Sequence, residues 1–381
     1  MPLEKKGLLA RFDPLLFFLC AATSLYGLAL IFSATRYSSS LHSAPMKQAA
    51  ALIAGMLAYV VLSLLPIEKL TARFWKPMVG INVLLLLLLI PFGNDDGTGN
   101  RSWLSLPGTP FNLQPGEVVK LSFLLLLSYQ LVRLREKQVR PLWRFLLPAG
   151  HTLALCALLY GVSGDMGMVL LYLFLFLFLA WCAGVSKRWL LAGIVLAGTG
   201  GVVAWPHLPP YIQMRLKVVW DHDLDPLGKG FQQSRSLLAI GSGQLSGQGY
   251  LRGIQTQSTA SSALPARHTD FLFSSAAEEL GLLGCGVILL LLGALIIQCI
   301  RISRKVDNPF SSLIAAGVGG MLAIQCILNV GMCLFLAPVV GLTLPFFSYG
   351  GSSLVTSWAA MGILSGIHAR NRNAIYEDAG P

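Results

Sequence analysis

The sequence is poor in charged residues. Only 12% of its 381 residues are Asp, Glu, Lys or Arg, whereas soluble domains carry about 25%. Together with 55% hydrophobic residues and a mean hydropathy of +0.67, this excludes an ordinary soluble domain and indicates an integral membrane protein. The net charge is +11. Because the basic residues flank apolar runs, we attribute this charge to membrane orientation and expect no nucleic-acid partner.

Several motifs with known chemistry are absent or incomplete. The seven cysteines lie in or beside apolar runs without a CxxC pair, which indicates neither a disulfide framework nor a zinc site. The run DHDLD at 221–225 has the spacing of a calcium loop, but Pro226 and Gln232 stand where that loop needs Gly and Glu. The glycines of 241–253 lack the dinucleotide-binding spacing and instead indicate close backbone approach or movement. No GxSxG elbow supports a serine nucleophile.

Apolar runs dominate what is present. A membrane-crossing helix needs about 20 residues, and the predicted fold is all-α and polytopic, with ten transmembrane helices in a single domain, 1–381. A long polar loop at about 207–270 separates spans seven and eight. The junction of spans five and six is only Gly164 and Asp165, so a single broken helix is an alternative there. The predicted spans are 14–33, 48–66, 77–92, 115–132, 145–163, 166–185, 189–206, 271–300, 311–337 and 351–368.

Basic residues orient these spans. The N-terminus resembles a signal peptide, but its apolar part has about 18 residues and no clear cleavage site follows, so we interpret it as a retained first span. With the N-terminus inside, 18 of the 28 Lys and Arg residues fall in inner segments. The positive-inside rule then predicts cytoplasmic termini and an outer long loop.

Asp270 is the leading candidate for chemistry. It lies near the end of the polar stretch 220–279, directly before an apolar run that begins with Phe271. A carboxylate at the edge of hydrocarbon is costly unless it has partners or a task.

Glu117 and Lys120 are three residues apart at the start of the fourth span, hence on one helix face. They could neutralise each other in the membrane, or act separately as a first-turn acid and a snorkelling lysine. Alternatively, Lys120 and Arg101 face an anionic head group.

Asp165, between two apolar runs, needs a basic partner or a water-filled cavity. Near the C-terminus, Ser352 lies where a broken helix could offer hydroxyl and N–H groups to an anion.

Four separated stretches then resemble one known family, the SEDS proteins (the RodA, FtsW and SpoVE group). They are RSWLSLPGTPFNLQPGEVVK, SGDMG, GFQQSRSLLAIGSGQLSGQGYLRGIQTQ with LPARHTDFLFSSAAEELGLLG, and NVGMCLFLAPVVGLTLPFFSYGGSS. The resemblance extends from about Asp13 to about Arg370, and the opening FDP is more similar to RodA than to FtsW. One departure is Gly164, where the family has proline.

The resemblance implies a ten-span peptidoglycan glycosyltransferase of the bacterial cytoplasmic membrane. Its substrate is lipid II, and its partner is a class B penicillin-binding protein that crosslinks the product. By position, Asp270 corresponds to the family's proposed catalytic acid. The remaining candidates are expected to bind substrate and comprise Arg101, Trp103, Glu117, Lys120, Asp165, His268 and Ser352.

The chemistry needs a base for a sugar hydroxyl and cations for a departing lipid diphosphate. We expect Asp270 to be the base, and Lys120, Arg101 and Arg267 to bind diphosphate. No fixed cofactor or protein-held metal is expected, with a divalent cation, Mg²⁺ or Mn²⁺, left open. Two other classes stay open: a transporter that flips lipid II and a non-enzymatic scaffold for the penicillin-binding protein.

Overall fold

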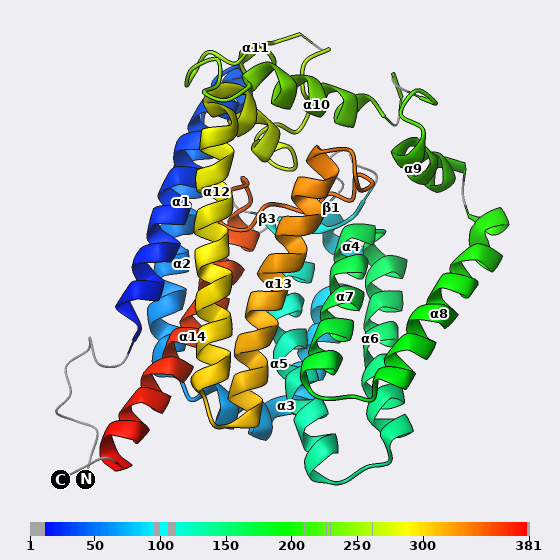
Figure 1. The fold of residues 1–381 in the computed structure, drawn as a ribbon, viewed down its shortest axis with the longest axis vertical. Helices are drawn as coiled ribbons and strands as arrows, with labels where there is room; N and C mark the ends of the chain where they lie inside the picture. The colour runs from blue at the N-terminus through cyan, green and yellow to red at the C-terminus, as the bar shows by residue number, and fades with distance from the viewer. Residues whose placement is uncertain are drawn as a thin grey trace.

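Long helices side by side form the body of the protein (Figure 1). The computed structural model describes residues 12–94, 100–105, 112–208, 210–225, 227–228, 230–260 and 262–378. The all-α prediction is confirmed, since the described residues contain only three short strands. The helices of the bundle are α1 (Pro14–Thr35), α2 (Ala44–Leu64), α3 (Ile67–Leu87), α4 (Leu89–Phe92), α5 (Pro115–Glu136), α6 (Pro141–Ser163), α7 (Met166–Cys182), α8 (Lys187–Ala204), α12 (Leu272–Lys305), α13 (Pro309–Cys333) and α14 (Gly351–Asp378).

The smaller elements lie toward one end of the bundle. We call this end the loop face, and the opposite end, at which α1 begins and α14 ends, the terminal face (Figure 1). The strands pair antiparallel in the order β1-β2-β3. These elements are η3 (Ser39–Leu41), β1 (Gly93–Asn94), β2 (Trp103–Ser105), β3 (Asn112–Leu113), η4 (Trp205–His207), α9 (Pro210–Trp220), α10 (Phe231–Gly243) and α11 (Ile254–Gln257).

Among the described residues, seven helices are long and apolar enough to cross a membrane, and α7 is a shorter apolar helix. Helices α5 and α14 pack against them. The exact number of ten spans stays a prediction, with which this arrangement is consistent. Helices α6 and α7 are separate, because Gly164 ends α6 in the left-handed conformation (φ 71°). Proline, whose ring fixes φ near −65°, cannot adopt that conformation, so glycine changes the local backbone at this position.

The third span begins earlier than predicted. Helix α3 starts at Ile67, whereas the predicted span starts at residue 77. Its first turns carry Glu68, Lys69 and Arg73, which hydropathy alone places outside the membrane. A non-helical backbone at Phe74 (φ −112°) divides this charged part from the apolar part.

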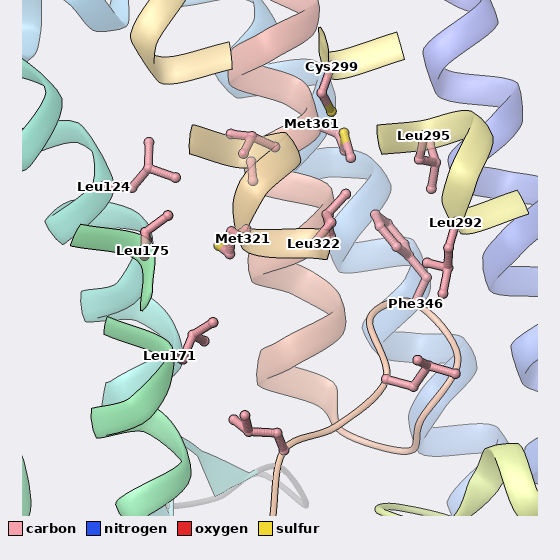
Figure 2. Packing of buried hydrophobic residues seen from close by; sticks show 14 of the residues in the cluster. Leu124, Leu171, Leu175, Leu292, Leu295, Cys299, Met321, Leu322, Phe346 and Met361 are labelled. Atoms are coloured by element: carbon pink, nitrogen blue, oxygen red, sulfur yellow. The ribbon is translucent and has the colours of Figure 1, made fainter. Parts of the chain in front are cut away.

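The core lies between α12, α13, α14 and the helices around them. Figure 2 shows Met361 of α14 among side chains from α5, α7, α12 and α13, with Phe346 from the loop that precedes α14. The most apolar stretch of α13 is 61% buried, but that of α8 only 6%. Helix α8 therefore stands at the margin of the bundle (Figure 1).

Helices α2 and α14 pack closely through two glycines and an aromatic cluster. A Cβ on Gly362 would lie 2.5 Å from the Tyr59 carbonyl oxygen, and one on Gly55 would lie 2.9 Å from the Trp358 ring. The rings of Tyr59 and Trp358 are 5.8 Å apart at their centroids and meet edge to face. Aromatic pairs in this geometry stabilise a core beyond their buried area.

The long loop is hydrogen-bonded to the bundle at a break in α12. Gly281 has φ 66° and ψ −164° within α12, a region that is essentially restricted to glycine. The backbone around it pairs with the loop through Gln248 N to Glu278 O (2.9 Å), Gly249 N to Glu279 O (2.9 Å), Leu282 N to Gln244 O (2.9 Å) and Leu283 N to Leu245 O (3.2 Å). A Cβ on Gly243 would lie 1.8 Å from the Ala277 carbonyl oxygen. Close backbone approach, one of the two predicted roles of these glycines, is therefore what the structure shows.

Gly281→Ala should destabilise the protein by at least about 1–3 kcal/mol, the usual cost of such backbone strain. The added methyl would also lie 2.4 Å from Gly247 N. Thermal unfolding of the purified protein in detergent measures this. Gly286→Ala in the same helix is the control, because nothing lies within 4 Å of its added Cβ. Equal midpoints for the two variants would contradict the prediction.

Candidate active site

The backbone of residues 268–270 is fixed by groups from two other segments. Asn329 of α13 donates from Nδ2 to the carbonyl oxygen of Asp270 (2.8 Å) and to that of Leu342 (2.7 Å). Ser348 donates from Oγ to the Thr269 carbonyl oxygen (2.6 Å). The backbone N–H of Tyr349 donates to the His268 carbonyl oxygen (2.9 Å). Three consecutive carbonyl groups are thus bound, which fixes where the Asp270 side chain begins.

The Asp270 carboxylate points toward the loop between α13 and α14. A Cβ added to Gly341 would lie 3.9 Å from Asp270 Oδ2, and Gly341 has φ 70°. The side chain is half-buried. Burial and, secondarily, the carboxylate of Asp165 raise the pKa of Asp270 to about 6, against the opposing effect of the Thr269 hydroxyl. A carboxylate with this pKa is a competent general base near neutral pH.

His268 is neutral at pH 7. Burial, and secondarily the positive charge of Arg267, lower the pKa of His268 to about 4. Its ring lies 5.7 Å from the Tyr349 ring, centroid to centroid. Its Nδ1 is buried and has no hydrogen-bond partner among the described residues. A neutral imidazole next to Asp270 can donate to or accept from a substrate hydroxyl but supplies no positive charge.

Asp165 lies at the start of α7, close enough to Asp270 to affect its pKa. As the N-cap of that helix, it accepts at Oδ1 from the Met168 N–H (3.0 Å). Its Oδ2 accepts from Gln114 Nε2 (3.2 Å). The expected basic partner is not among its described contacts. The helix N-terminus and an amide take that place, and both favour a carboxylate.

Glu117 and Lys120 form an ion pair inside the bundle. Lys120 Nζ also lies 3.5 Å from Gln325 Oε1 of α13, and Glu117 Oε2 accepts from Thr356 Oγ1 of α14 (3.1 Å). The two residues are 2% and 1% exposed. Of the predicted alternatives, the structure shows that Glu117 and Lys120 neutralise each other. The Lys120 ammonium is buried and does not face a site for an anionic head group in this conformation.

Arg101 and Trp103 lie just before and on β2, and Ser352 lies at the start of α14. Arg101 is exposed, and Trp103 is half-buried on β2. Ser352 donates from Oγ to the Asn112 carbonyl oxygen (3.1 Å) and accepts from the Gln114 N–H (3.0 Å). Ser352 therefore joins the β3 segment to α14, and both hydrogen bonds are made within the protein.

The expectation that Arg267 binds diphosphate is wrong for this conformation. Its side chain is 4% exposed, and its Nη1 donates to the carbonyl oxygens of Gln255 and Thr256. The guanidinium lies 3.5 Å from the Tyr37 ring centroid. Arg267 thus binds the α11 segment, and its guanidinium is engaged within the protein.

Sequence reasoning missed two acids, Glu278 and Glu279, which lie eight and nine positions after Asp270. Glu278 accepts at Oε1 from the Gln255 N–H (2.7 Å) and at Oε2 from the Thr256 N–H (2.7 Å), which caps α11. Glu279 accepts from Ser33 Oγ (2.5 Å) and from Gln257 Nε2 (2.8 Å). Both acids stand inside the predicted span 271–300, where a carboxylate without a partner is costly, so sequence reasoning could have identified them.

A cavity of about 230 Å³ borders the loops around Asp270. Its lining residues include Pro265, five positions before Asp270, and Val339, two positions before Gly341, whereas Asp270 itself does not line it. Arg215 of α9 also lines it, with no hydrogen bond or ion pair to a described residue. This cation was not among the predicted site residues, because only the folded loop brings α9 next to residue 265.

The residues present are compatible with a substrate-linked cation. Within the described ranges, no three His, Cys, Asp or Glu side chains form a group that could bind a metal ion. Asp270 and Asp165 supply two carboxylates in one region. Mg²⁺ is often bound by one or two carboxylates together with substrate phosphates, so a divalent cation stays a prediction.

Lys120→Met should destabilise the protein by about 3–5 kcal/mol, because it leaves the Glu117 carboxylate buried without its charge partner. The double variant Glu117→Gln with Lys120→Met should recover most of that loss. Thermal unfolding in detergent measures both. A double variant no more stable than the single one would show that the pair is not coupled as the geometry indicates.

Comparison with known proteins identifies the family of this chain. The model of the FtsW, RodA and SpoVE family, described as cell cycle proteins, matches residues 13–373. A probable peptidoglycan glycosyltransferase FtsW of Bacillus subtilis is 33% identical over 380 residues, covering 95% of this chain and 92% of the relative. The peptidoglycan glycosyltransferase MrdB of Escherichia coli K12 is 31% identical over 364 residues, covering 94% of each.

Solved structures agree with this result. The rod shape determining protein RodA of Thermus thermophilus has a TM-score of 0.67 and 30% identity, covering 94% of this chain and 96% of that protein. A chain of a peptidoglycan synthase complex, described as coordinating polymerization and crosslinking, has a TM-score of 0.78 and 32% identity, covering 94% and 98%. These comparisons show that the chain belongs to the FtsW, RodA and SpoVE family, the SEDS proteins.

Proposed function

We propose that this protein is a peptidoglycan glycosyltransferase that polymerises lipid II, with Asp270 as the general base. Relatives named as such enzymes cover nearly the whole chain. The mechanism rests on the position and the raised pKa of Asp270. Asn329 fixes the backbone of Asp270, and burial raises the pKa of its carboxylate to about 6.

The proposed orientation follows from charge. The connections at the terminal face are rich in Lys and Arg, for example residues 133–144 and 301–305. Cytoplasmic connections collect such residues, so the terminal face is assigned to the cytoplasm. Asp270, at the loop face, is then extracytoplasmic, and both termini are cytoplasmic.

The proposed reaction is an inverting transfer. Asp270 takes the proton from the 4-hydroxyl of the acceptor sugar while that oxygen bonds to the anomeric carbon of the donor. The bond from this carbon to the diphosphate oxygen breaks on the opposite face, and lipid diphosphate leaves. Its negative charge needs cations. Because Lys120 and Arg267 are engaged within the protein, Arg101 and Arg215 are the proposed cations for it.

A class B penicillin-binding protein is the proposed partner. A similar chain has been solved within a complex that coordinates polymerization and crosslinking. A transpeptidase partner would place the crosslinking reaction beside the newly formed strand at the loop face.

The flippase alternative is less well supported by the packing. A flippase needs a polar path through the bundle, but the Glu117 and Lys120 pair is enclosed between α5, α13 and α14. The two described cavities lie at opposite faces and share no lining residue. A scaffold role gives no reason for a fixed carboxylate with a raised pKa.

Asp270→Asn should abolish lipid II polymerisation by the purified protein in detergent, where flipping has no meaning. Proton transfer by a positioned base contributes about 10² to 10⁴ in rate, so the loss should reach at least this size at unchanged thermal stability. Asp307→Asn, in the exposed connection before α13 at the terminal face, is the matched control. Near wild-type polymerisation by the Asp270 variant would remove Asp270 from the mechanism.

The polymerisation rate should also follow the ionisation of Asp270. A base acts only when deprotonated, so the rate should rise with pH below about 6 and level off above it. Thr269→Val should move this midpoint upward, because the Thr269 hydroxyl lowers the pKa of Asp270. Initial rates between pH 5 and 8 test this, and a rate independent of pH through that range would contradict it.

A further inference from the structure

A second cavity, far from Asp270, lies at the terminal face and measures about 290 Å³. Its lining residues come from the start of α3, the end of α5 and the connection into α13, and these helix ends meet at the terminal face (Figure 1). Its size is at the lower limit of small-molecule sites, so it suits a compact polar group. We call it the terminal-face pocket, and its lining comprises Glu68, Lys69, Ala72, Tyr129, Val132, Arg133, Glu136, Asn308, Pro309 and Phe310.

Aromatic residues place the pocket at the depth of lipid head groups. Phe74 and Trp75 follow Lys69 on α3 and are 45% and 37% exposed. Arg73 lies 5.5 Å from the Phe74 ring centroid, and Lys76 lies 5.6 Å from the Trp75 ring. Exposed aromatic side chains with adjacent cations are typical of the boundary between hydrocarbon and water. The backbone kink at Phe74 marks where α3 turns from that boundary into the bundle.

The pocket offers cations that the protein itself does not neutralise. Lys69 is exposed and makes no hydrogen bond or ion pair with a described residue. Arg133 is exposed, with its guanidinium 5.5 Å from the Tyr129 ring centroid and a hydrogen bond to the Tyr129 hydroxyl. That contact orients Arg133 along the pocket wall and leaves its other N–H donors available.

The acids of the pocket differ in availability. Glu68 accepts two hydrogen bonds from Arg370 Nη2 (3.1 and 2.8 Å) and one from Ser311 Oγ (3.0 Å). Its charge is therefore balanced within the protein. Glu136, at the end of α5, is exposed and has no ion pair in the described part of the chain. The pocket thus presents two cations and one carboxylate to a ligand.

We propose that the terminal-face pocket binds the head group of a phospholipid in the adjacent leaflet. Lys69 and Arg133 bind its phosphodiester, and Glu136 binds a primary amine, which selects phosphatidylethanolamine. The phosphodiester is common to phosphatidylglycerol and phosphatidylcholine, whose head groups lack that amine. The acyl chains stay outside the pocket, against the apolar surface of the bundle. This site stands apart from the proposed catalysis at Asp270.

Native mass spectrometry of the full-length protein tests this proposal, after addition of phosphatidylethanolamine, phosphatidylglycerol or phosphatidylcholine to the delipidated sample. Lys69→Gln with Arg133→Gln should lower the retained phosphatidylethanolamine about tenfold, because two charge-assisted contacts are lost. Arg73→Gln with Lys76→Gln is the matched control. It removes the same charge from the same face but outside the pocket, and it should retain the lipid.

Two further variants sharpen the result. Glu136→Gln should reduce the preference for phosphatidylethanolamine over phosphatidylglycerol without loss of phosphatidylglycerol. Ala72→Phe fills the pocket without a change of charge and should lower retention of both lipids, which tests the site even where the double variant fails to fold. Equal losses in the pocket and control variants, unchanged retention with Ala72→Phe, or adducts with the mass of inorganic phosphate alone would overturn the proposal.

Discussion

The hydrogen bonds that fix the carbonyl groups of residues 268–270 are the constraint on which the candidate site depends. Asn329, Ser348 and the Tyr349 N–H each satisfy one of these carbonyls. A buried carbonyl without a donor is costly, so the chain entering α12 has little freedom to move. The side chain of Asp270 is thereby directed at the loop between α13 and α14. That loop is itself tied down, since Asn329 also binds the Leu342 carbonyl oxygen.

The cost of a buried polar group without a partner also explains the polar contacts elsewhere in the bundle. Glu117 and Lys120 neutralise each other, with Gln325 and Thr356 as further partners. The carboxylate of Glu278 accepts hydrogen bonds from the N–H groups of α11. Polar groups are expensive at membrane depth, so most of them have structural partners. Asp270 and His268 differ, because their backbone carbonyl groups are hydrogen-bonded within the protein while their side chains lie at the loop face.

Sequence reasoning predicted the features that depend on local pattern. The helical spans follow from apolar runs, the Glu117 and Lys120 pair follows from their spacing on one helix face, and Asp270 follows from its place at the edge of an apolar run. The features it missed depend on segments that are distant in the sequence. The hydrogen bond from Asn329 to Asp270 joins residues 59 positions apart, and the one from Thr356 to Glu117 joins residues 239 positions apart. The break at Gly281 was also missed, because its cause lies in the loop that pairs with it. The start of α3 was misplaced because its first turns are charged and lie at the boundary of the bundle.

Ser352, Gln114 and Asp165 form a continuous hydrogen-bonded chain from the start of α14 to the start of α7. Asp165 in turn affects the proton affinity of Asp270 through space. A shift of the β-sheet segment by as little as one hydrogen-bond length would alter how Asp165 is solvated. The start of α14 is thereby linked through Gln114 to the carboxylate that raises the pKa of Asp270, so a change in the β3 segment is expected to alter the basicity of Asp270 without direct contact between the two.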